Sequence, residues 1–276
     1  MLYIFIESID DLSFLNNELL KKSHIGVDTE FRRTTKDNMK LALLQINDGE
    51  EIYLIDALRI RDPGDSCAFL ESPSVTKIFH SCKEDLEAVY AWTGRKMINI
   101  FDTQIANSFL GGSYSIGYQS LVEQELSIEL EKNETRSNWF RRPLSSSQLK
   151  YAALDVEYLL YLYSIQIKDL KKFHKIEWLE EEVKFLIKNT FNPHLLELDT
   201  HRSISRSEED LLLKRLNVLV RNIALKNNIN ETLLFSKRIQ KYLLRSALVS
   251  GVDRACEEFT DWRKDLIMED LTQLIL

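Results

Sequence analysis

Residues 24–58 contain three apolar runs, HIGVDTEF (24–31), KLALLQI (40–46) and EIYLIDAL (51–58). Each run is short and rich in aliphatic residues, which is typical of β-strands in a sheet. Asn47-Asp48-Gly49 stands between the second and third runs and is a strong signal for a hairpin turn. The sequence therefore predicts three strands here, the last two joined as a hairpin.

Strand-like and helix-like segments alternate on both sides of these runs. The flanking segments with strand character are LYIFI (2–6), VTKIFHS (75–81) and MINIF (97–101). DDLSFLNNELLKK (10–22) instead carries leucines at helical spacing, and each of the two later strands leads into a helix. This alternation predicts an α/β domain built on a mixed sheet with helices on its faces.

The pattern becomes all helical from about residue 145. It predicts one long helix from PLSSSQ (143–148) to about residue 173, and a second helix over about residues 176–188. The stretch at 189–207 interrupts this pattern, and two or three further helical patterns follow it. We therefore predict a catalytic domain over residues 1–175, a helical connector and linker over 176–205, and a small all-α domain over 206–276.

The net charge of −7 is unevenly distributed along the chain. Residues 1–200 hold 23 basic and 32 acidic side chains, whereas residues 201–276 hold 13 and 11. Within residues 211–245 there is one acid, Glu231, and the basic residues are Lys214, Arg215, Arg221, Lys226, Lys237, Arg238, Lys241 and Arg245. An acidic body with a basic segment fits a metal-dependent enzyme that acts on a polyanion. A solvated helix face is the alternative explanation of the basic residues.

No apolar run approaches the roughly 18 residues that are needed to span a bilayer, so we expect no membrane partner. The apolar N-terminal run is not preceded by basic residues and is interpreted as a strand. Cys67, Cys82 and Cys256 lie far apart and have no companion ligands at metal-site spacing. They are predicted to be free thiols, which favours a cytoplasmic location.

Asp28 and Glu30 lie two residues apart in the first central run. Alternate residues of a strand share a face, so these carboxylates point to one side, and Val27, Thr29 and Phe31 to the other. Two carboxylates this close repel each other and are costly to desolvate, and a divalent cation relieves both costs. The pair by itself is also typical of the wet face of an ordinary strand.

Asp85 lies in FHSCKEDLEAVY (79–90), just after a predicted strand. Ser81 and Glu84 have the spacing of a capping box, which predicts a helix start and places Asp85 in the first helical turn. This is close to the carboxyl end of a strand, where α/β sheets place their functional sites. The alternative is that Asp85 only interacts with the helix dipole.

Tyr151 and Asp155 lie four residues apart in LSSSQLKYAALDVEYLLYLY (144–163). Ser145 and Gln148 again have capping-box spacing, and an apolar stripe with helical period follows them. Residues four apart lie one above the other on a helix, so a phenol here can position a water next to a metal-binding carboxylate. A Tyr–Asp pair on a helix surface is the alternative.

Together the three motifs resemble those of the tyrosine-type branch of the DEDD exonuclease superfamily. The motifs are D-x-E in the strand 24–31, Asp85 in FHSCKEDLEAV (79–89) and Y-x-x-x-D in YAALDVEYLL (151–160). The longer segments FDTQIANSFLGGSYSIGYQSLVEQEL (101–126) and TRSNWFRRPLSSSQLKYAALDVEYLLYLY (135–163) are similar to bacterial ribonuclease D. The resemblance covers nearly all of residues 1–170. It implies a ribonuclease H-like mixed sheet with flanking helices, followed by a small all-α domain.

The resemblance also implies a catalytic set of Asp28, Glu30, Asp85, Tyr151 and Asp155, in which the four acids form the metal site. Asp28, Glu30 and Asp155 would hold two divalent ions, Mg²⁺ or Mn²⁺, with Asp28 bridging them, and Asp85 would contribute through a water. Tyr151 would orient the attacking water. The implied reaction is hydrolysis of RNA from its 3′ end by a two-metal mechanism that releases nucleoside 5′-monophosphates. The implied substrates are tRNA precursors or other structured RNA with a single-stranded 3′ end.

Further contacts with RNA are expected around this set. Phe31 and Tyr118 are candidates for stacking on terminal bases, and the candidates for phosphate contacts are Arg136, Arg141 and Arg142. Packing or surface roles are the alternatives for all five.

The C-terminal segment resembles a helical nucleic-acid-binding domain of the helicase-and-RNase-D C-terminal (HRDC) type. LLLKRLNVLVRNIALKNNINETLLFSKRIQKYLLRS (211–246) resembles the first helices of such a domain, and FTDWRKDLI (259–267) resembles a later one. Ribonuclease D carries two of these domains after its catalytic domain, and the residues after the predicted linker suffice for one.

Two other functions are compatible with these residues. One is an exonuclease of the same fold that acts on DNA or on very short oligonucleotides, because the five catalytic residues do not read the 2′-hydroxyl that distinguishes RNA. The other is a non-catalytic RNA-binding adaptor on an exonuclease scaffold. The intact catalytic set favours an enzyme over the adaptor.

Overall fold

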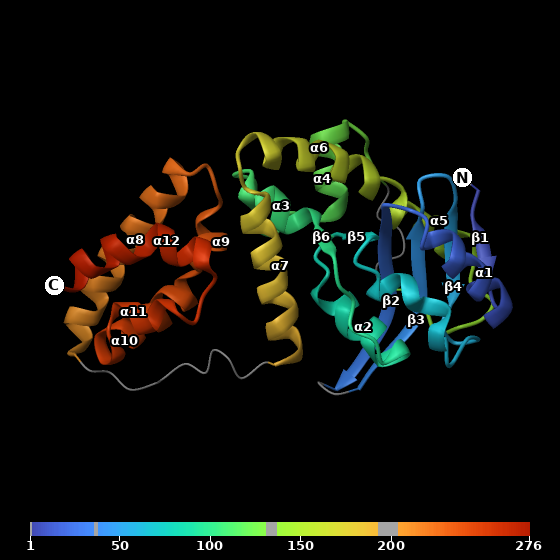
Figure 1. Ribbon diagram of the computed structural model, residues 1–276, viewed down its shortest axis with the longest axis horizontal. Helices are drawn as coiled ribbons and strands as arrows, with labels where there is room; N and C mark the ends of the chain where they lie inside the picture. The colour runs from blue at the N-terminus through green and yellow to red at the C-terminus, as the bar shows by residue number, and fades with distance from the viewer. Residues whose placement is uncertain (1, 36–37, 131–136, 193–203) are drawn as a thin grey trace. The chain divides into compact units, whose positions relative to one another are not determined.

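The computed structural model describes residues 2–35, 38–130, 137–192 and 204–276 (Figure 1). The elements are β1 (Ile4–Ile6), α1 (Ile9–Leu19), β2 (His24–Thr35), β3 (Asn38–Asn47), β4 (Ile52–Asp56), the 3₁₀ helix η1 (Gly64–Glu71), β5 (Thr76–Phe79), α2 (Lys83–Thr93), β6 (Ile100–Asp102), α3 (Thr103–Phe109), α4 (Tyr118–Leu126), α5 (Ser146–Glu157), α6 (Leu159–Lys172), α7 (Ile176–Phe191), α8 (Arg206–Lys226), α9 (Glu231–Phe235), α10 (Lys237–Ser250), α11 (Val252–Cys256) and α12 (Asp261–Ile275).

Contacts between residues divide the chain into two compact units. The first contains residues 1–104 and 116–168, and the second contains residues 105–115 and 169–276. The domains predicted from the sequence, with boundaries at 175 and 205, stay a prediction.

A six-stranded mixed sheet is the centre of the first unit, with the strand order β1-β4-β3-β2-β5-β6. The β2–β3 and β3–β4 pairs are antiparallel, and the other three pairs are parallel. The predicted hairpin joins β3 to β4, where Gly49 has a φ of 92° and the Asp48 carboxylate accepts the N–H groups of Glu50 and Glu51. β2 and β3 continue beyond their predicted ends as a two-stranded ribbon (Figure 1). The predicted mixed sheet is confirmed.

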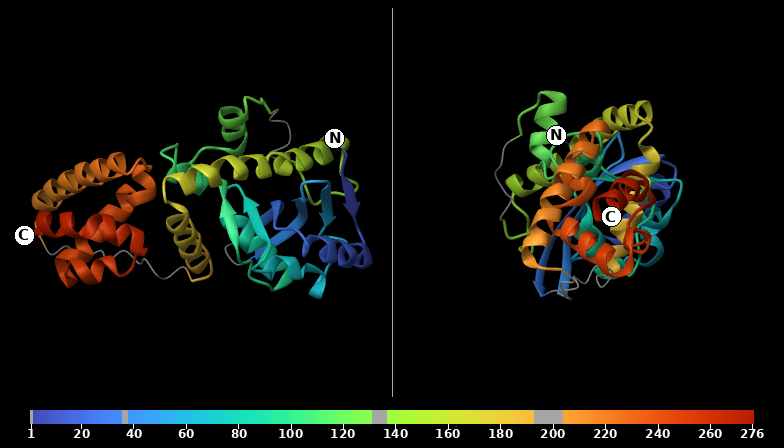
Figure 2. Two further views of the ribbon diagram at one scale, coloured as in Figure 1. Left: turned by 45° about the horizontal axis from the view of Figure 1, so that its top comes forward. Right: turned by 90° about the vertical axis from the view of Figure 1, so that its left-hand side faces the viewer.

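Helices cover both faces of this sheet (Figure 2). α2 packs on one face of β2 and β3, and α5 packs on the other face of β2, β3 and β4. The alternation along β2 explains this arrangement, because Val27 and Thr29 are buried towards α2, and Gly26 contacts the end of α5. Asp28 and Glu30 therefore lie on the α5 face.

The helix predicted from residue 143 to about 173 is two helices, so the prediction of one continuous helix is wrong. α5 ends at Glu157, and Tyr158 (φ −100°, ψ 0°) separates it from α6. The Tyr118 hydroxyl donates to the Leu154 carbonyl oxygen (3.1 Å) and accepts the Tyr158 N–H (3.0 Å). The phenol thus occupies the place of the hydrogen bond that would join residues 154 and 158. A side chain inserted into the helical ladder interrupts the helix at that point.

The second unit is all helical in the described residues, as predicted. Trp262 of α12 packs against Trp178 of α7 and against Phe109, with ring centroids 5.6 and 5.0 Å away. The guanidinium group of Arg263 forms a buried ion pair with Glu182. The segment after residue 204 contains five helices, α8 to α12, more than the two or three predicted. Two of them, α9 and α11, have five residues each and are too short to give a periodic signal.

The three cysteines are unpaired and buried, which confirms the predicted free thiols. Burial raises the pKa of the Cys67 thiol to about 12, so this thiol stays protonated at neutral pH. Within the described ranges, no helix is long and apolar enough to cross a membrane.

Candidate active site

Asp28, Glu30 and Asp155 form a cluster of carboxylates. One oxygen atom from each residue lies within 4.8 Å of the other two. β2 supplies the first two side chains from one face, and α5, which packs on that face, supplies the third. Several carboxylate oxygens converging on one point suit a hard divalent cation such as Mg²⁺ or Mn²⁺.

The start of α5 is fixed by the predicted capping box. The Ser145 hydroxyl accepts the Gln148 N–H, and the Gln148 side chain accepts the Ser145 N–H. Ala152, Ala153 and Val156 then bury one side of the helix. Small residues at two of these positions let α5 lie close to the sheet, and Asp155 is thereby held above β2.

The end of α5 is held by β2 and β3. The Asn47 side-chain amide donates to the carbonyl oxygens of Val156 and Glu157, both at 3.1 Å. A Cβ on Gly26 would lie 3.1 Å from the Leu159 Cβ and 3.3 Å from the Val156 carbonyl oxygen. Such contacts are tighter than most Cβ atoms make, so glycine at position 26 lets the helix end approach β2 without a shift of its neighbours.

Asp85 is buried, with 6% of its surface exposed, and is near enough to the cluster for its charge to raise the pKa values of Asp28 and Glu30. Its Oδ1 atom accepts a hydrogen bond from the Thr29 hydroxyl, so the residue between Asp28 and Glu30 holds it from the other face of β2. Asp85 is not among the three carboxylates that converge. This place fits a group that acts on the metal site through a water.

The predicted capping box of Ser81 and Glu84 is not formed, so that prediction is wrong. α2 begins at Lys83, with Cys82 as its N-cap and no side-chain cap. Ser81 adopts a left-handed conformation (φ 65°), and the Asp102 carboxylate accepts the N–H groups of Ser81 and Cys82. A carboxylate from the neighbouring strand β6 thus closes the turn that delivers Asp85.

Tyr151 and Asp155 lie on neighbouring turns of α5 and interact, as their four-residue spacing predicts. The phenol donates a hydrogen bond to the Asp155 carboxylate, and this bond lowers the pKa of Asp155. The indole ring of the buried Trp139 lies 6.1 Å from the Tyr151 ring, measured between centroids. Packing and the hydrogen bond together fix the phenol next to the carboxylate cluster.

The pKa values of all four acids are raised. Burial is the main cause for each, and it raises the pKa of Glu30 to about 9 and those of Asp85 and Asp155 to about 7. The pKa of Asp28 lies well above its usual range, because the charges of Asp85, Asp155 and Glu30 add to burial. The site therefore favours protons or a cation over four free negative charges.

A family model described as 3′–5′ exonuclease matches residues 3–171, which include the whole cluster. The chain belongs to this exonuclease family. Membership implies dependence on a divalent metal ion, and the oxygen donors of the cluster fit that requirement.

Individual relatives give the same assignment. Ribonuclease D of Pseudomonas paraeruginosa is 40% identical over 182 residues, which are 65% of this chain and 48% of that protein. Ribonuclease D of Escherichia coli is 41% identical over 160 residues, 58% of this chain and 43% of that protein. The predicted resemblance to ribonuclease D is confirmed. The chain spans about half the length of the curated relatives that it matches.

Solved structures show the same fold. The crystal structure of E. coli RNase D matches with a TM-score of 0.67 and 26% identity, over 100% of this chain and 74% of that one. The catalytic core of RRP6 from Trypanosoma brucei shares the fold with a TM-score of 0.61 and 20% identity, over 99% of this chain and 79% of that one. The predicted ribonuclease H-like fold is confirmed.

The raised pKa values of this exonuclease site predict how the stability of the metal-free protein depends on pH. The unfolded chain loses these protons near its usual carboxyl pKa of about 4, whereas the folded chain keeps them up to about 7 to 9. Between these limits the unfolded state binds fewer protons, so stability falls as pH rises. We expect the thermal midpoint in EDTA to fall from about pH 5 to pH 9, and Glu30→Gln to flatten that fall. Equal slopes for the two proteins would contradict the assignment.

The residues predicted to contact RNA have different environments. Phe31 is half-buried and follows Glu30 on β2, and Arg141 is exposed. Arg136 lies outside the described residues. The Tyr118 hydroxyl is engaged at the α5–α6 break, and the edge of the His80 ring packs against the Tyr118 ring. The Tyr118 hydroxyl thus helps to hold the end of α5, and base stacking by the Tyr118 ring stays a prediction.

Arg142 also has a structural role. Its guanidinium group binds the buried Asp56 carboxylate through two N–H groups, at 2.6 and 2.7 Å. The remaining N–H groups donate to the carbonyl oxygens of Ala42, Trp139 and Arg141. Ala42 has no partner in the β2–β3 pairing, because Glu30 pairs with Leu43 and the next residue, Phe31, pairs with Leu41. All five donors are used inside the protein, so we assign Arg142 to packing and not to phosphate binding.

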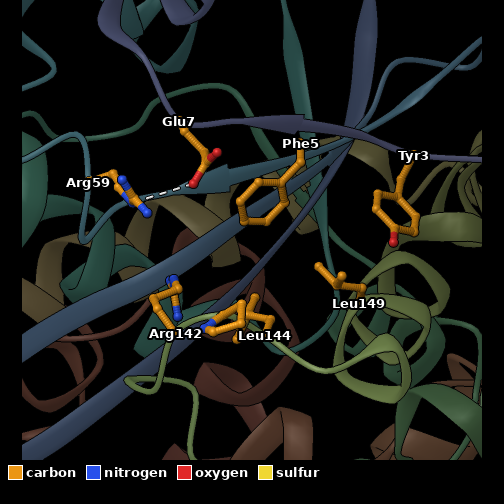
Figure 3. Close-up of a pocket in the computed structure, with 8 residues that line it drawn as sticks. Tyr3, Phe5, Glu7, Arg59, Arg142, Leu144 and Leu149 are labelled. Atoms are coloured by element: carbon orange, nitrogen blue, oxygen red, sulfur yellow. Dashed lines mark ion pairs between the residues drawn. The ribbon is translucent and has the colours of Figure 1, made fainter.

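A separate pocket of about 520 Å³ lies at the edge strand β1 (Figure 3). It is lined by Tyr3, Phe5, Glu7, Arg59, Arg142, Pro143, Leu144 and Leu149. Two of these residues, Arg59 and Glu7, form an ion pair at 3.4 Å. None of the five residues predicted to be catalytic lines this pocket.

Sequence patterns missed several residues that build the site. Four of them are buried and polar. Thr29 holds Asp85, and Asn47 holds the end of α5. Asp56 binds Arg142, and Asp102 holds the start of α2. Asp56 and Asp102 each end a short apolar strand. An acidic residue at the end of an apolar strand is the sequence signal by which Asp56 and Asp102 could have been found.

Proposed function

We propose that this protein is a metal-dependent 3′→5′ exoribonuclease that hydrolyses RNA to nucleoside 5′-monophosphates. The observation that carries the proposal is the convergence of Asp28, Glu30 and Asp155 within 4.8 Å, inside the segment that the exonuclease family model matches. Asp85 and Tyr151 complete the arrangement at its edges.

The proposed roles follow from position. Asp28, Glu30 and Asp155 would hold the divalent ions, two Mg²⁺ or Mn²⁺. When bound, these ions would supply activation of a water and neutralisation of charge on the entering and leaving oxygens of an in-line displacement. Thr29 fixes Asp85 through their hydrogen bond, and Asp85 orders a water at the edge of the site. Tyr151 donates to Asp155, and its oxygen can accept a hydrogen bond from the attacking water.

For the substrate we propose RNA, and specifically the 3′ ends of tRNA precursors or of other structured RNA. Support comes from the curated ribonuclease D relatives and from E. coli RNase D, which is described as an exoribonuclease involved in structured RNA processing. We also propose a cytoplasmic location, which three unpaired, buried thiols favour.

An assay on matched single strands of RNA and DNA, each labelled at the 5′ end, tests the proposal. We expect stepwise shortening of the RNA from its 3′ end in Mg²⁺ or Mn²⁺, release of nucleoside 5′-monophosphates, and no reaction in EDTA. Faster shortening of DNA, or action on di- and trinucleotides only, would favour the oligonucleotide exonuclease. Tight RNA binding without hydrolysis would favour the adaptor.

The basic segment at 211–245 is proposed to bind RNA and to set affinity rather than chemistry. Arg221 and Arg245 are paired with Glu231 and Glu209. Lys237 and Arg238, at the start of α10, are exposed, and the described residues offer them no ion pair. Cations that are not neutralised by the protein are available to phosphates.

We expect the double variant Lys237→Gln/Arg238→Gln to bind a tRNA-sized RNA more weakly. The slope of log K against the logarithm of the salt concentration should become less steep by about 0.7 for each phosphate contact that is lost. Hydrolysis of a short single strand at saturating concentration is expected to change little. A substitution tests RNA binding more directly than a truncation, because removing α12 would expose Trp178 and Phe109 and so disturb the packing of the second unit. The control is Lys21→Gln/Arg59→Gln, which removes two cations already paired with acids. Identical affinity and salt slope in both variants would reduce the segment to a solvated surface.

A further inference from the structure

Gln45 lies on β3 directly opposite Asp28 of β2. Residues opposite each other in an antiparallel pair share a face, with Cβ atoms about 4.5–5.5 Å apart. Gln45 is therefore on the α5 face of the sheet, next to the carboxylate cluster but not part of it.

The Gln45 side chain is wholly buried, with 0% of its surface exposed. Neither its amide nitrogen nor its amide oxygen has a hydrogen-bond partner in the described part of the chain. A buried amide without partners is costly, and an apolar side chain of similar size would avoid that cost. Glutamine at this position is therefore not explained by the packing of α5 on the sheet.

Two neighbouring polar side chains on this face, those of Asn47 and Asp56, have hydrogen-bond partners. Asn47, two residues along β3, donates to the carbonyl oxygens at the end of α5. Asp56, opposite Leu43 in the next strand, binds Arg142. Of Asn47, Asp56 and Gln45, it is Gln45, opposite Asp28, whose side-chain atoms have no hydrogen-bond partner among the described residues.

We propose that Gln45 is a positioning residue for Asp28, and that its amide N–H donates to the Asp28 carboxylate through one buried water. A carboxylate accepts hydrogen bonds and does not donate them when ionised, so the amide nitrogen is the group that serves it. A donor on one side of Asp28 fixes the orientation in which its oxygens meet the metal. Partners of this kind, one step removed from the ion, commonly change metal affinity by about 10- to 100-fold. The inference rests on the proposed function, because it takes Asp28 as a metal ligand.

The test is Gln45→Met, which keeps length and volume and removes both amide atoms. Calorimetric titration with Mn²⁺ alone is expected to show affinity weakened by about 10- to 100-fold. The thermal midpoint in EDTA is expected to change little, because the loss of a water-mediated hydrogen bond is offset by the removal of a buried amide. A residue that only holds the fold would lower the midpoint and leave the Mn²⁺ affinity unchanged.

Gln166→Met is the matched control. Gln166 is also buried, and its amide oxygen likewise has no partner among the described residues, but its amide nitrogen donates to the Thr103 carbonyl oxygen, so this variant should be less stable in EDTA with unchanged Mn²⁺ affinity. Unchanged Mn²⁺ affinity in Gln45→Met would overturn the proposal. Failure of the unaltered protein itself to bind Mn²⁺ would instead overturn the proposed metal site.

Discussion

Asp28→Asn and Asp155→Asn are each expected to lose turnover by about a thousandfold or more while the fold is kept. Each change removes a negative ligand from the cluster in which three carboxylate oxygens lie within 4.8 Å. Metal ions supply several kcal/mol of charge stabilisation to a phosphoryl-transfer transition state, and each 1.36 kcal/mol corresponds to about tenfold in rate. The measurement is the rate of nucleoside 5′-monophosphate release from RNA at saturating Mg²⁺ or Mn²⁺.

The same substitutions are expected to stabilise the metal-free protein. Burial raises the pKa values of both residues, and for Asp28 the charges of the neighbouring acids add to it, which means that their ionised forms destabilise the fold at neutral pH. The thermal midpoint in EDTA at pH 8 should rise, by about 2–4 °C for each kcal/mol relieved. Asp62→Asn, which changes an exposed carboxylate, is the control and should alter neither property. Near-normal turnover in either cluster variant would remove that residue from the metal site.

The sequence predicted the parts of the site that depend on local periodicity. Asp28 and Glu30 share a face because a strand alternates, and Tyr151 and Asp155 meet because a helix repeats every 3.6 residues. The capping box of Ser145 was also predictable, since both partners lie within one turn. Each of these relations is set by neighbours in the chain, and a single sequence contains that information.

Relations that depend on distant partners were not predictable from pattern. Tyr118 interrupts the helix at Tyr158, 40 residues away, and nothing near residue 158 signals a break. Asp102 replaces Ser81 as the group that closes the turn before α2, although Ser81 has the right spacing for a cap. A local motif gives way where a buried carboxylate from another strand offers a stronger, charge-assisted partner to the same N–H groups.

Arg142 illustrates the same limit for function. Its position ahead of the catalytic helix, in a run with Arg141, suggested a phosphate contact. The skipped Ala42 carbonyl and the buried Asp56 carboxylate, about 100 and 86 residues away, use its guanidinium group instead. Whether a basic residue is available to a ligand depends on acceptors that the fold brings to it, and the fold is the information that the pattern lacks.

Tyr151→Phe is expected to slow hydrolysis by about 10- to 1,000-fold and to leave metal binding largely intact. The variant keeps the ring that packs near Trp139 and loses the hydroxyl that donates to Asp155. In the proposed mechanism this hydroxyl orients the attacking water, so its loss removes one directed hydrogen bond at the transition state. Burial raises the pKa of Asp155 to about 7 even though the hydrogen bond from this hydroxyl lowers it, so loss of the hydroxyl should raise that pKa further and move the acidic limb of the pH–rate profile to higher pH.

Tyr161→Phe, which alters a phenol that is 60% exposed on α6, is the control for loss of a hydroxyl and should change neither rate nor pH profile. Mn²⁺ affinity separates two roles for Tyr151, because a water-orienting group lowers the turnover number while the metals still bind. If Tyr151→Phe weakened Mn²⁺ binding as severely as Asp155→Asn, the phenol would serve to hold Asp155 in place for the metal, and the attacking water would need another partner. If the rate were unchanged at every pH, the hydrogen bond between Tyr151 and Asp155 would belong to the packing of α5 alone.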